Sequence, residues 1–399
     1  MATNIGKGFH AEIAGAGIGG LTAAAALAQR GWSVRVHERA PDLRAFGAGI
    51  YIWGNGLKVL KAIGAYEEAV QGAHVGSSFQ TRDHLDDTME HIPINGPGGA
   101  QLVTILRETL IRALVNACRR AGVKIVTNSA AVAAEPEGVL CLADGRRHKA
   151  DLVIASDGIN SPVRDSLDLL QYRVPLRYGA VRMLISRSDD DLPSRLDKDT
   201  YIEYFAGTRR ILYTPSSKTD LYVALCCEEE DYAARAVPID PALWQQSFPH
   251  LSRLIARFAD AGRWDSFEIV KLKTWSAGRV AILGDAAHAM PPYLGQGGGC
   301  ALMNALSVAV AASADPRDIP RALTQWECQE RTLTDHTQDT AHTMGAMNNW
   351  PDAVRSDVLK IVGRSEQLAI QRMKTAVHVP TGTEADFSQL PASAPSDVS

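Results

Sequence analysis

Residues 11–38 read AEIAGAGIGGLTAAAALAQRGWSVRVHE, and this stretch decides the fold. Residues 11–16 are predicted to form a short buried strand, and residues 21–30 have strong helix propensity. Residues 33–38 alternate polar and apolar side chains, which is typical of a second strand. A strand, a tight turn, a helix and a second strand within about 30 residues form a βαβ unit. The chain is therefore expected to begin with an α/β domain.

The turn between the first strand and the helix is rich in glycine. Gly15, Gly17 and Gly20 satisfy the pattern GxGxxG, in which glycines permit a tight turn and let a pyrophosphate approach a helix N-terminus. Glu38 lies 18 residues after Gly20 and can accept hydrogen bonds from a ribose diol, and Arg39 beside it is a further cofactor-binding candidate. The pattern predicts a Rossmann-like, dinucleotide-binding domain, with a purely structural turn as the alternative. It does not distinguish FAD from NAD.

Two later segments each end a predicted buried strand with a glycine and an aspartate. They are ASDGINSPVR at 155–164 and GDAAHAMPPYLGQGGG at 284–299. Carboxylates there can receive ribityl or ribose hydroxyls, and backbone N–H groups at a helix start favour anionic charge. The cofactor-binding candidates in these segments are Asp157, Gly284, Asp285, Gly297 and Gly298. Taken alone, either aspartate is equally well explained as a turn or helix-capping residue.

The composition is that of an ordinary globular chain. The 399 residues are 46% apolar and 22% charged, with a formal net charge of −4 and no long Lys/Arg run. We find no signal peptide in the first ten residues and no apolar run of about 18 residues that would span a membrane. The six cysteines lack CxxC spacing, which disfavours a metal site or a disulfide framework. We expect a cytoplasmic monomer or homodimer that binds no metal, nucleic acid or membrane.

The three glycine-bearing motifs occur in the order and spacing of a known family. GAGIGG, ASDGINSPVR and GDAAHAMPPYLGQGGG resemble the single-component aromatic-hydroxylase flavoproteins, the para-hydroxybenzoate hydroxylase-like family, over roughly residues 10–345. Arg107 in ILRETL resembles the family's flavin-contacting arginine. The resemblance implies one FAD per chain, with NADH or NADPH visiting the flavin without a second Rossmann domain. It also implies that O2 adds to flavin carbon C4a, giving a hydroperoxide that attacks an activated aromatic carbon.

The middle of the chain changes character, because residues 177–230 consist of short alternating segments typical of an antiparallel sheet. Helical patterns return at 240–260 and over most of 297–375. The predicted class is α/β, with a Rossmann-like FAD-binding domain, an antiparallel substrate domain and C-terminal helices. The expected division is an FAD-binding domain of 1–75, 100–176 and 270–345, a substrate domain of 76–99 and 177–269, a helical segment of 346–379 and a disordered tail of 380–399.

Within the family, segments 37–60, 209–225 and 284–305 most resemble members that oxygenate 3-hydroxypyridine carboxylates in vitamin B6 breakdown. In those members oxygenation is coupled to ring opening, and the residues here do not separate ring opening from hydroxylation. The resemblance places three candidates around the substrate, Arg210, Tyr222 and Tyr51, and the stiff loop that begins at Pro291 adds Pro292 as a fourth.

Each of these candidates has a chemical reason and a plainer alternative. The planar fork of Arg210 matches a carboxylate, although a surface arginine on a strand is the alternative. Tyr222 and Tyr51 can bond a ring hydroxyl or nitrogen, or be half-buried sheet tyrosines. Pro292 lies in a stiff loop whose carbonyl can face the substrate. Phe79 stands where the relatives carry a ring-facing tyrosine.

Two further residues invite a chemical role that we do not assign. His288 is expected to be a hydrogen-bonded structural histidine, and Cys300 a packing residue. The expected function is an NAD(P)H- and O2-dependent flavin monooxygenase acting on a hydroxylated pyridine carboxylate. The alternatives are a hydroxylase of a benzoate-type phenol, a flavin dehydrogenase or oxidase on the same scaffold, and a flavin-binding sensor.

Overall fold

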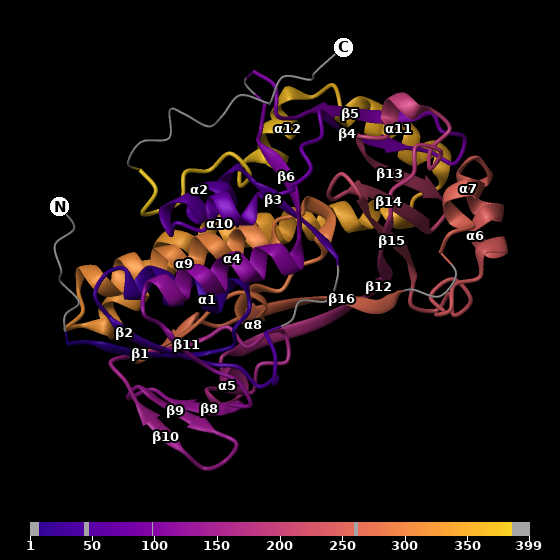
Figure 1. The fold of residues 1–399 in the computed structure, drawn as a ribbon. Helices are drawn as coiled ribbons and strands as arrows, with labels where there is room; N and C mark the ends of the chain where they lie inside the picture. The colour runs from indigo at the N-terminus through magenta and orange to yellow at the C-terminus, as the bar shows by residue number, and fades with distance from the viewer. Residues whose placement is uncertain (1–7, 44–47, 98, 259–261, 385–399) are drawn as a thin grey trace.

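The computed structural model describes residues 8–43, 48–97, 99–258 and 262–384 (Figure 1). Its N-terminal part is built on a six-stranded sheet. In spatial order the strands are β17 (Ser276–Ala277), β18 (Val280–Ile282), β11 (Leu152–Ala155), β1 (His10–Ala14), β2 (Ser33–His37) and β7 (Lys124–Val126). All neighbours run parallel except β17 and β18. The predicted βαβ unit is present, with α1 (Ile18–Ala28) between β1 and β2.

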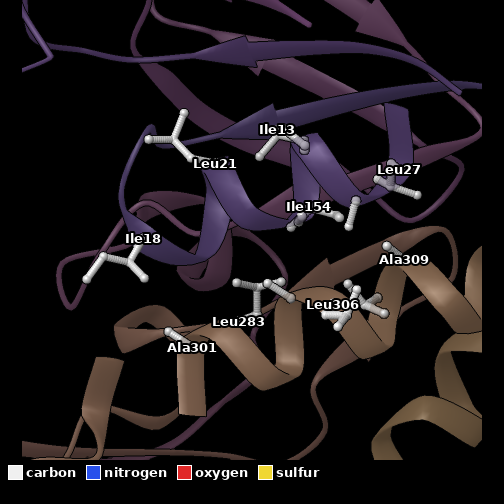
Figure 2. Close-up of a cluster of buried hydrophobic side chains, with 14 of the residues drawn as sticks. Ile13, Ile18, Leu21, Leu27, Ile154, Leu283, Ala301, Leu306 and Ala309 are labelled. Carbon is white, nitrogen blue, oxygen red and sulfur yellow. The ribbon is translucent and has the colours of Figure 1, made fainter. Parts of the chain in front are cut away.

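Helices cover this sheet and form the main core with it. The covering helices are α1, α2 (Gly54–Ala62), α3 (Tyr66–Ala69), α4 (Arg107–Arg120), α9 (Gly297–Ala314) and α10 (Ile319–Gly345). Helix α1 is buried from Ile18 to Leu27, and its run of alanines lets α9 pack closely against it. In Figure 2, Leu283 and Leu306 lie between α1 and α9.

Helix α9 corrects one expectation from the sequence. Gly297–Ala314 has the length of a membrane-spanning helix and a mean hydropathy of 1.4, so a run of that kind is present after all. However, 72% of the helix is buried inside the protein, where it contacts α1, α2 and α10. Core helices of globular proteins share this composition, and burial accounts for it here.

A second, seven-stranded sheet forms the middle of the chain, as the alternating segments predict. In spatial order its strands are β16 (Arg263–Leu272), β12 (Leu170–Ser186), β15 (Asp220–Glu228), β14 (Arg209–Pro215), β13 (Tyr201–Ala206), β4 (Ser78–Arg82) and β5 (Thr88–Pro93). All neighbours are antiparallel except β13 and β4. The observed elements therefore match the predicted fold class.

The two faces of this sheet have different neighbours because side chains alternate along each strand. On β15, Leu221, Val223 and Leu225 point to one face, where they pack under α6 (Pro241–Ser247) and α7 (Ser252–Ile255). The predicted helix at 240–260 is thus two short helices joined by η2 (Pro249–Leu251). Tyr222 and Ala224 point to the opposite face.

The remaining elements connect or cover these layers. They are the pair β3 (Gly49–Trp53) and β6 (Leu102–Leu106), the sheet β8 (Ala131–Glu135), β9 (Val139–Leu142) and β10 (Arg147–Lys149), helices α5 (Pro162–Ser166), α8 (Asp285–His288), α11 (Asp352–Val362) and α12 (Glu366–Met373), and η1 (Arg195–Asp197), η3 (Pro292–Leu294) and η4 (Ala346–Asn349).

A disordered tail was predicted for residues 380–399, but residues 380–384 are ordered against the protein. The Thr381 hydroxyl donates to Glu330 at 2.8 Å, and Thr383 is buried, so 380–384 pack against the protein. Residues 385–399 lie outside the described residues.

The contact between α1 and α9 predicts a large packing effect. Leu306→Ala removes a fully buried side chain, so we expect the free energy of unfolding to fall by about 2 to 5 kcal/mol. Leu196→Ala is the control, because Leu196 is 93% exposed and its loss is expected to cost less than about 0.5 kcal/mol. Urea denaturation followed by circular dichroism measures both. Equal midpoints for the two variants would contradict the packing described here.

Candidate active site

A cavity of about 480 Å³ lies at the carboxyl ends of β1, β2 and β11 and beside the N-terminus of α9. We refer to it as the cofactor cavity. Ten of the predicted cofactor-binding residues line it: Gly15, Gly17, Glu38, Arg39, Arg107, Asp157, Gly284, Asp285, Gly297 and Gly298. Three segments far apart in the sequence therefore meet at one site. Open α/β sheets bind ligands at this position.

The glycines of the first turn have different physical roles. Gly15 has φ +95°, and a Cβ there would lie 2.3 Å from the Ser156 carbonyl oxygen. A Cβ on Gly20 would lie 2.0 Å from the Gly15 carbonyl oxygen, so Gly20 serves the packing of α1 on β1 and does not line the cavity. Gly17 meets no atom within 4 Å in the Cβ direction and leaves space for a ligand.

Two helices present unsatisfied N–H groups at the cofactor cavity. Helix α1 follows Gly17 and helix α9 follows Gln296, and neither start has a side-chain cap. Free N–H groups and the positive end of the helix dipole favour an anionic group at both places. A pyrophosphate at one start and a negatively charged ring at the other would satisfy them.

Three acidic side chains, Glu38, Asp157 and Asp285, also line the cofactor cavity. Glu38 is fixed by backbone N–H groups of Ala16 at 3.0 Å and Ala40 at 2.9 Å, and each of its oxygens retains capacity to accept a further bond. Asp285 is exposed at the cavity. Burial raises the pKa of Asp157, although Ser161 and the Val163 backbone lie near enough to oppose the shift, and among the described residues neither of its oxygens makes a well-aligned hydrogen bond. A ligand carrying hydroxyl groups would supply such bonds, as FAD does.

A smaller chamber of about 80 Å³ adjoins the cofactor cavity and lies on the open face of the seven-stranded sheet. Arg210, Tyr222, Tyr51 and Pro292, the four predicted substrate-contacting residues, all line it. The residues shared by both spaces are Tyr51, Arg182, Leu212, Tyr222, Pro292 and Gly295. The chamber is therefore placed where a substrate would meet the reactive ring of a bound cofactor.

Arg210 is not the surface arginine of the alternative interpretation, because it is only 4% exposed. Its Nη1 lies 2.8 Å from Oε1 of Glu203, and its guanidinium lies 4.7 Å from the centre of the Tyr293 ring. Its Nε has no partner among the described residues. A buried ion pair thus forms part of the chamber wall. Glu203, Arg182 and Tyr293 were not predicted from the sequence, although a lone acid in the apolar strand YIEYFA was a signal for Glu203.

The two predicted tyrosines are buried at the chamber. Burial raises the pKa of both Tyr222 and Tyr51, so both hydroxyls keep their protons at neutral pH. The Tyr51 hydroxyl lies 2.7 Å from Thr214 Oγ1, and its ring packs edge-on against Tyr201 at 5.3 Å. Phe79 approaches Tyr51 from another side, with ring centres 6.3 Å apart.

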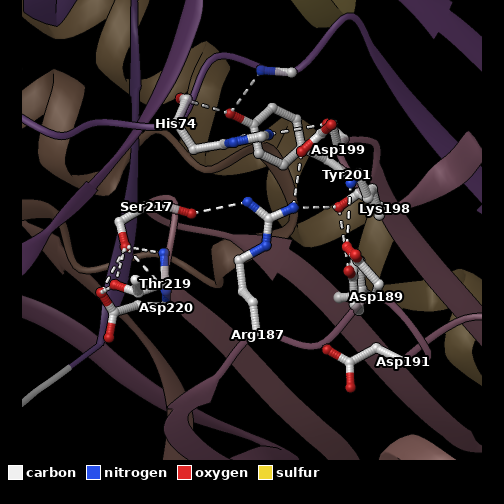
Figure 3. Close-up of polar contacts among 12 residues, drawn as sticks. His74, Arg187, Asp189, Asp191, Lys198, Asp199, Tyr201, Ser217, Thr219 and Asp220 are labelled. Carbon is white, nitrogen blue, oxygen red and sulfur yellow. Dashed lines mark hydrogen bonds and ion pairs between the residues drawn. The ribbon is translucent and has the colours of Figure 1, made fainter. Parts of the chain in front are cut away.

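A polar network outside the chamber fixes Tyr201 and therefore Tyr51 (Figure 3). The Tyr201 hydroxyl donates to the His74 carbonyl oxygen at 3.0 Å and accepts from Gly76 N at 3.3 Å. Arg187 donates to the carbonyl oxygens of Lys198 and Ser217, both at 2.8 Å, which ties the β14–β15 turn to the preceding loop. The position of Tyr51 thus depends on contacts made well away from the chamber.

The loop that carries Pro292 separates the two spaces. Pro292 begins η3, and the loop then turns at Gly295, where φ is +60° and a Cβ would come within 3.1 Å of Tyr51 Cβ. His288 and Cys300 line neither space. His288 Nε2 lies 3.0 Å from Asn304 Nδ2, and burial raises the pKa of Cys300 to about 12. Both therefore fit the structural roles that we expected.

The open space beside Gly17 predicts a variant that folds but binds its cofactor poorly. In Gly17→Ala the added methyl group meets no protein atom but occupies the path of a pyrophosphate, so we expect FAD affinity to fall at least tenfold. Flavin fluorescence titration of the apoprotein measures it. Gly96→Ala is the matched control, because Gly96 also has free space and lies outside the cavity. Unchanged affinity in Gly17→Ala would remove the turn from the FAD site.

The buried His288 predicts a pH effect on stability. Burial lowers the pKa of His288 from 6.5 to about 4, so between these values only the unfolded chain binds the proton. Stability from this group is therefore complete above pH 6.5 and is lost as pH falls toward 4, by on the order of 3 kcal/mol. We expect the urea midpoint of His288→Asn to depend less on pH in this window than that of the exposed control His91→Asn. Identical slopes would contradict this assignment.

Comparison with known proteins identifies the family. The family described as FAD binding domain matches residues 10–344. A probable 2-heptyl-3-hydroxy-4(1H)-quinolone synthase of Rhodococcus erythropolis is 45% identical over 93% of this chain and 97% of its own length. A 2-heptyl-3-hydroxy-4(1H)-quinolone synthase of Mycobacteroides abscessus is 42% identical over 91% of this chain and 97% of its own.

A solved structure agrees with these relatives. The tetrameric form of 2-methyl-3-hydroxypyridine-5-carboxylic acid oxygenase is 37% identical and superposes with a TM-score of 0.83, covering 93% of this chain and 96% of that chain. The resemblance that we drew from three glycine-bearing motifs is confirmed. The chain belongs to the family of FAD-binding, para-hydroxybenzoate hydroxylase-like proteins and is a flavin-dependent aromatic monooxygenase.

Proposed function

We propose that the chain hydroxylates carbon C3 of a 2-alkyl-4(1H)-quinolone, using O2 and either NADH or NADPH. The observation that carries this proposal is the buried ion pair of Arg210 and Glu203 in the wall of the chamber. The names of the relatives at 45% and 42% identity, both synthases of a 3-hydroxy-4-quinolone, support the same substrate class.

The ion pair favours a neutral ring over a carboxylate. Glu203 already balances the charge of Arg210, so a carboxylate ligand would bring a second negative charge into a buried place that holds one positive charge. A 4-quinolone is neutral, and its ring N–H can donate a hydrogen bond to the Glu203 carboxylate. Arg210 then holds Glu203 in position.

The same contact activates the ring for oxygenation. A hydrogen bond from the ring N–H to the Glu203 carboxylate increases the electron density of the N1–C2=C3 system. C3 therefore becomes more nucleophilic. The Tyr222 hydroxyl stays protonated and makes no hydrogen bond to another described residue, so it can donate to the ring carbonyl oxygen. Bound reduced FAD supplies an electrophilic oxygen atom from O2. Hydrogen at C3 is replaced by hydroxyl, the second oxygen atom leaves as water, and NAD(P)H provides the two electrons.

A second candidate substrate is a 3-hydroxypyridine carboxylate, which we expected from the sequence. The likeness to 2-methyl-3-hydroxypyridine-5-carboxylic acid oxygenase and the position of Arg210 and Tyr222 in the chamber support it. This reaction places a second carboxylate beside the ion pair, which favours replacement of Glu203 by the ligand as the main partner of Arg210. The two candidates therefore differ in whether Arg210 keeps Glu203 as its main partner or turns its donors, including the unpartnered Nε, to a ligand carboxylate.

A direct comparison of substrates tests the proposal. We expect 2-heptyl-4(1H)-quinolone to stimulate NADH or NADPH oxidation and to acquire one atom from labelled O2, as measured by mass spectrometry. Stimulation by 3-hydroxypyridine carboxylates alone would favour the second candidate. Coenzyme oxidation that leaves no label in any product would contradict both.

A change at Glu203 tests the proposed contact. Glu203→Gln keeps the size of the side chain but weakens the acceptor, so we expect kcat/KM for the quinolone to fall by at least about tenfold with FAD still bound. The same change frees Arg210 and is expected to strengthen inhibition by an aromatic carboxylate. Glu230→Gln, in an exposed turn, is the matched control. Weaker carboxylate binding in Glu203→Gln would show that Glu203 does not oppose a carboxylate.

A further inference from the structure

The chamber continues beyond the ion pair into a region whose wall is mostly apolar, with Arg372 as a charged residue at its outer side. Six apolar side chains line this part, which we call the apolar end: Trp53, Phe79, Ile92, Leu102, Met373 and Ala376. The first four come from β3, β4, β5 and β6, and all six belong to one hydrophobic cluster. The ion pair lies at the other side, where Ala180, Ala224 and Phe267 form a second cluster. The chamber thus has a polar place and an apolar place in one continuous space.

The outer wall of the apolar end comes from the C-terminal part of the chain. Met373 ends helix α12, and Arg372 beside it also lines the chamber. The rest of α12 packs little, with Leu368 45% and Ile370 58% exposed. In Figure 1, α12 lies near the edge of the sheet formed by β4 and β5.

Among the described residues, two contacts fasten α12 over the chamber: an ion pair of Arg372, and the approach of His336 Nε2 to the Gln371 carbonyl oxygen at 3.1 Å. Arg372 Nη1 lies 2.6 Å from Oε1 of Glu90, which is 5% exposed on β5. The residues that follow α12 make contacts of their own. Thr375 Oγ1 lies 2.7 Å from Thr337 Oγ1, and Asn55 N donates to the Ala376 carbonyl oxygen at 3.1 Å. These contacts place Met373 and Ala376 at the end of the chamber.

We propose that the apolar end holds the alkyl chain of the substrate and that Met373 sets the preferred chain length. The inference rests on the proposed function, because it takes the polar place to hold the quinolone ring. A neutral ring at the ion pair leaves its 2-alkyl group to fill the adjoining apolar space. Each methylene buried there is expected to increase affinity about fourfold. The unbranched methionine side chain can adjust to fill the gap at the end of the chain.

The test uses 2-alkyl-4(1H)-quinolones with methyl, pentyl, heptyl, nonyl and undecyl groups. The FAD-loaded protein is titrated with each, and Kd is taken from the change in the flavin absorption spectrum, which needs no turnover. Met373→Trp shortens the apolar end, so we expect the Kd of the heptyl compound to rise at least tenfold while that of the methyl compound changes less than about threefold. Met373→Ala lengthens it and is expected to move the preferred chain to nonyl or undecyl.

Leu368→Ala is the control, because Leu368 lies on the exposed side of the same helix and lines neither cavity. It is expected to leave the whole series unchanged. Parallel changes for methyl and heptyl compounds in Met373→Trp would overturn the proposal, and so would an unaltered series in both Met373 variants.

Failure of the proposed function has a different signature. If the wild-type protein binds longer alkyl chains more tightly but inserts no oxygen, the assignment of the apolar end stands and the proposed reaction is wrong. If the wild-type protein oxygenates the heptyl compound but the Met373 variants do not change the preference for chain length, the proposed reaction stands and the assignment of Met373 is wrong. A wild-type protein that binds no member of the series overturns both.

Discussion

The close contact between α1 and the first strand is the constraint on which the rest of the structure depends. A Cβ on Gly20 would lie 2.0 Å from the Gly15 carbonyl oxygen, and a Cβ on Gly15 would lie 2.3 Å from the Ser156 carbonyl oxygen. Only glycine at both places lets the helix start, the turn and the end of β11 come together. Their approach creates the cofactor cavity and brings Asp157 to its wall, where burial raises its pKa.

Side chains alternate between the two faces of the seven-stranded sheet, so one face serves packing and the other faces the chamber. The packing face is sealed under α6 and α7. Arg209 and Arg210 are neighbours in sequence but point to opposite faces. Arg209 pairs with Asp231 and contacts α6, whereas Arg210 pairs with Glu203 beside the cofactor cavity. A single strand therefore supplies both a structural ion pair and one that lines the chamber.

The sequence predicted the parts of the molecule whose signals are local. The βαβ unit, the glycine turns and the alternating strands follow from spacing and periodicity within short segments, and ten of eleven cofactor candidates line one cavity. The parts that it missed depend on pairing between distant segments. Glu203 meets Arg210 only through the register of β13 and β14, and Arg372 meets Glu90 across 282 residues. The contribution of α12 to the chamber has no local signature.

The proposed function requires that the ion pair of Arg210 and Glu203 receive a neutral ring and stay intact when it does so. A crystal structure of the FAD-loaded protein with 2-heptyl-4(1H)-quinolone would show both. We predict the ring nitrogen within hydrogen-bonding distance of the Glu203 carboxylate, with Arg210 still paired to Glu203 and the heptyl group against Met373. A ligand bound with Arg210 turned away from Glu203, and with its ring nitrogen facing another residue, would contradict the account.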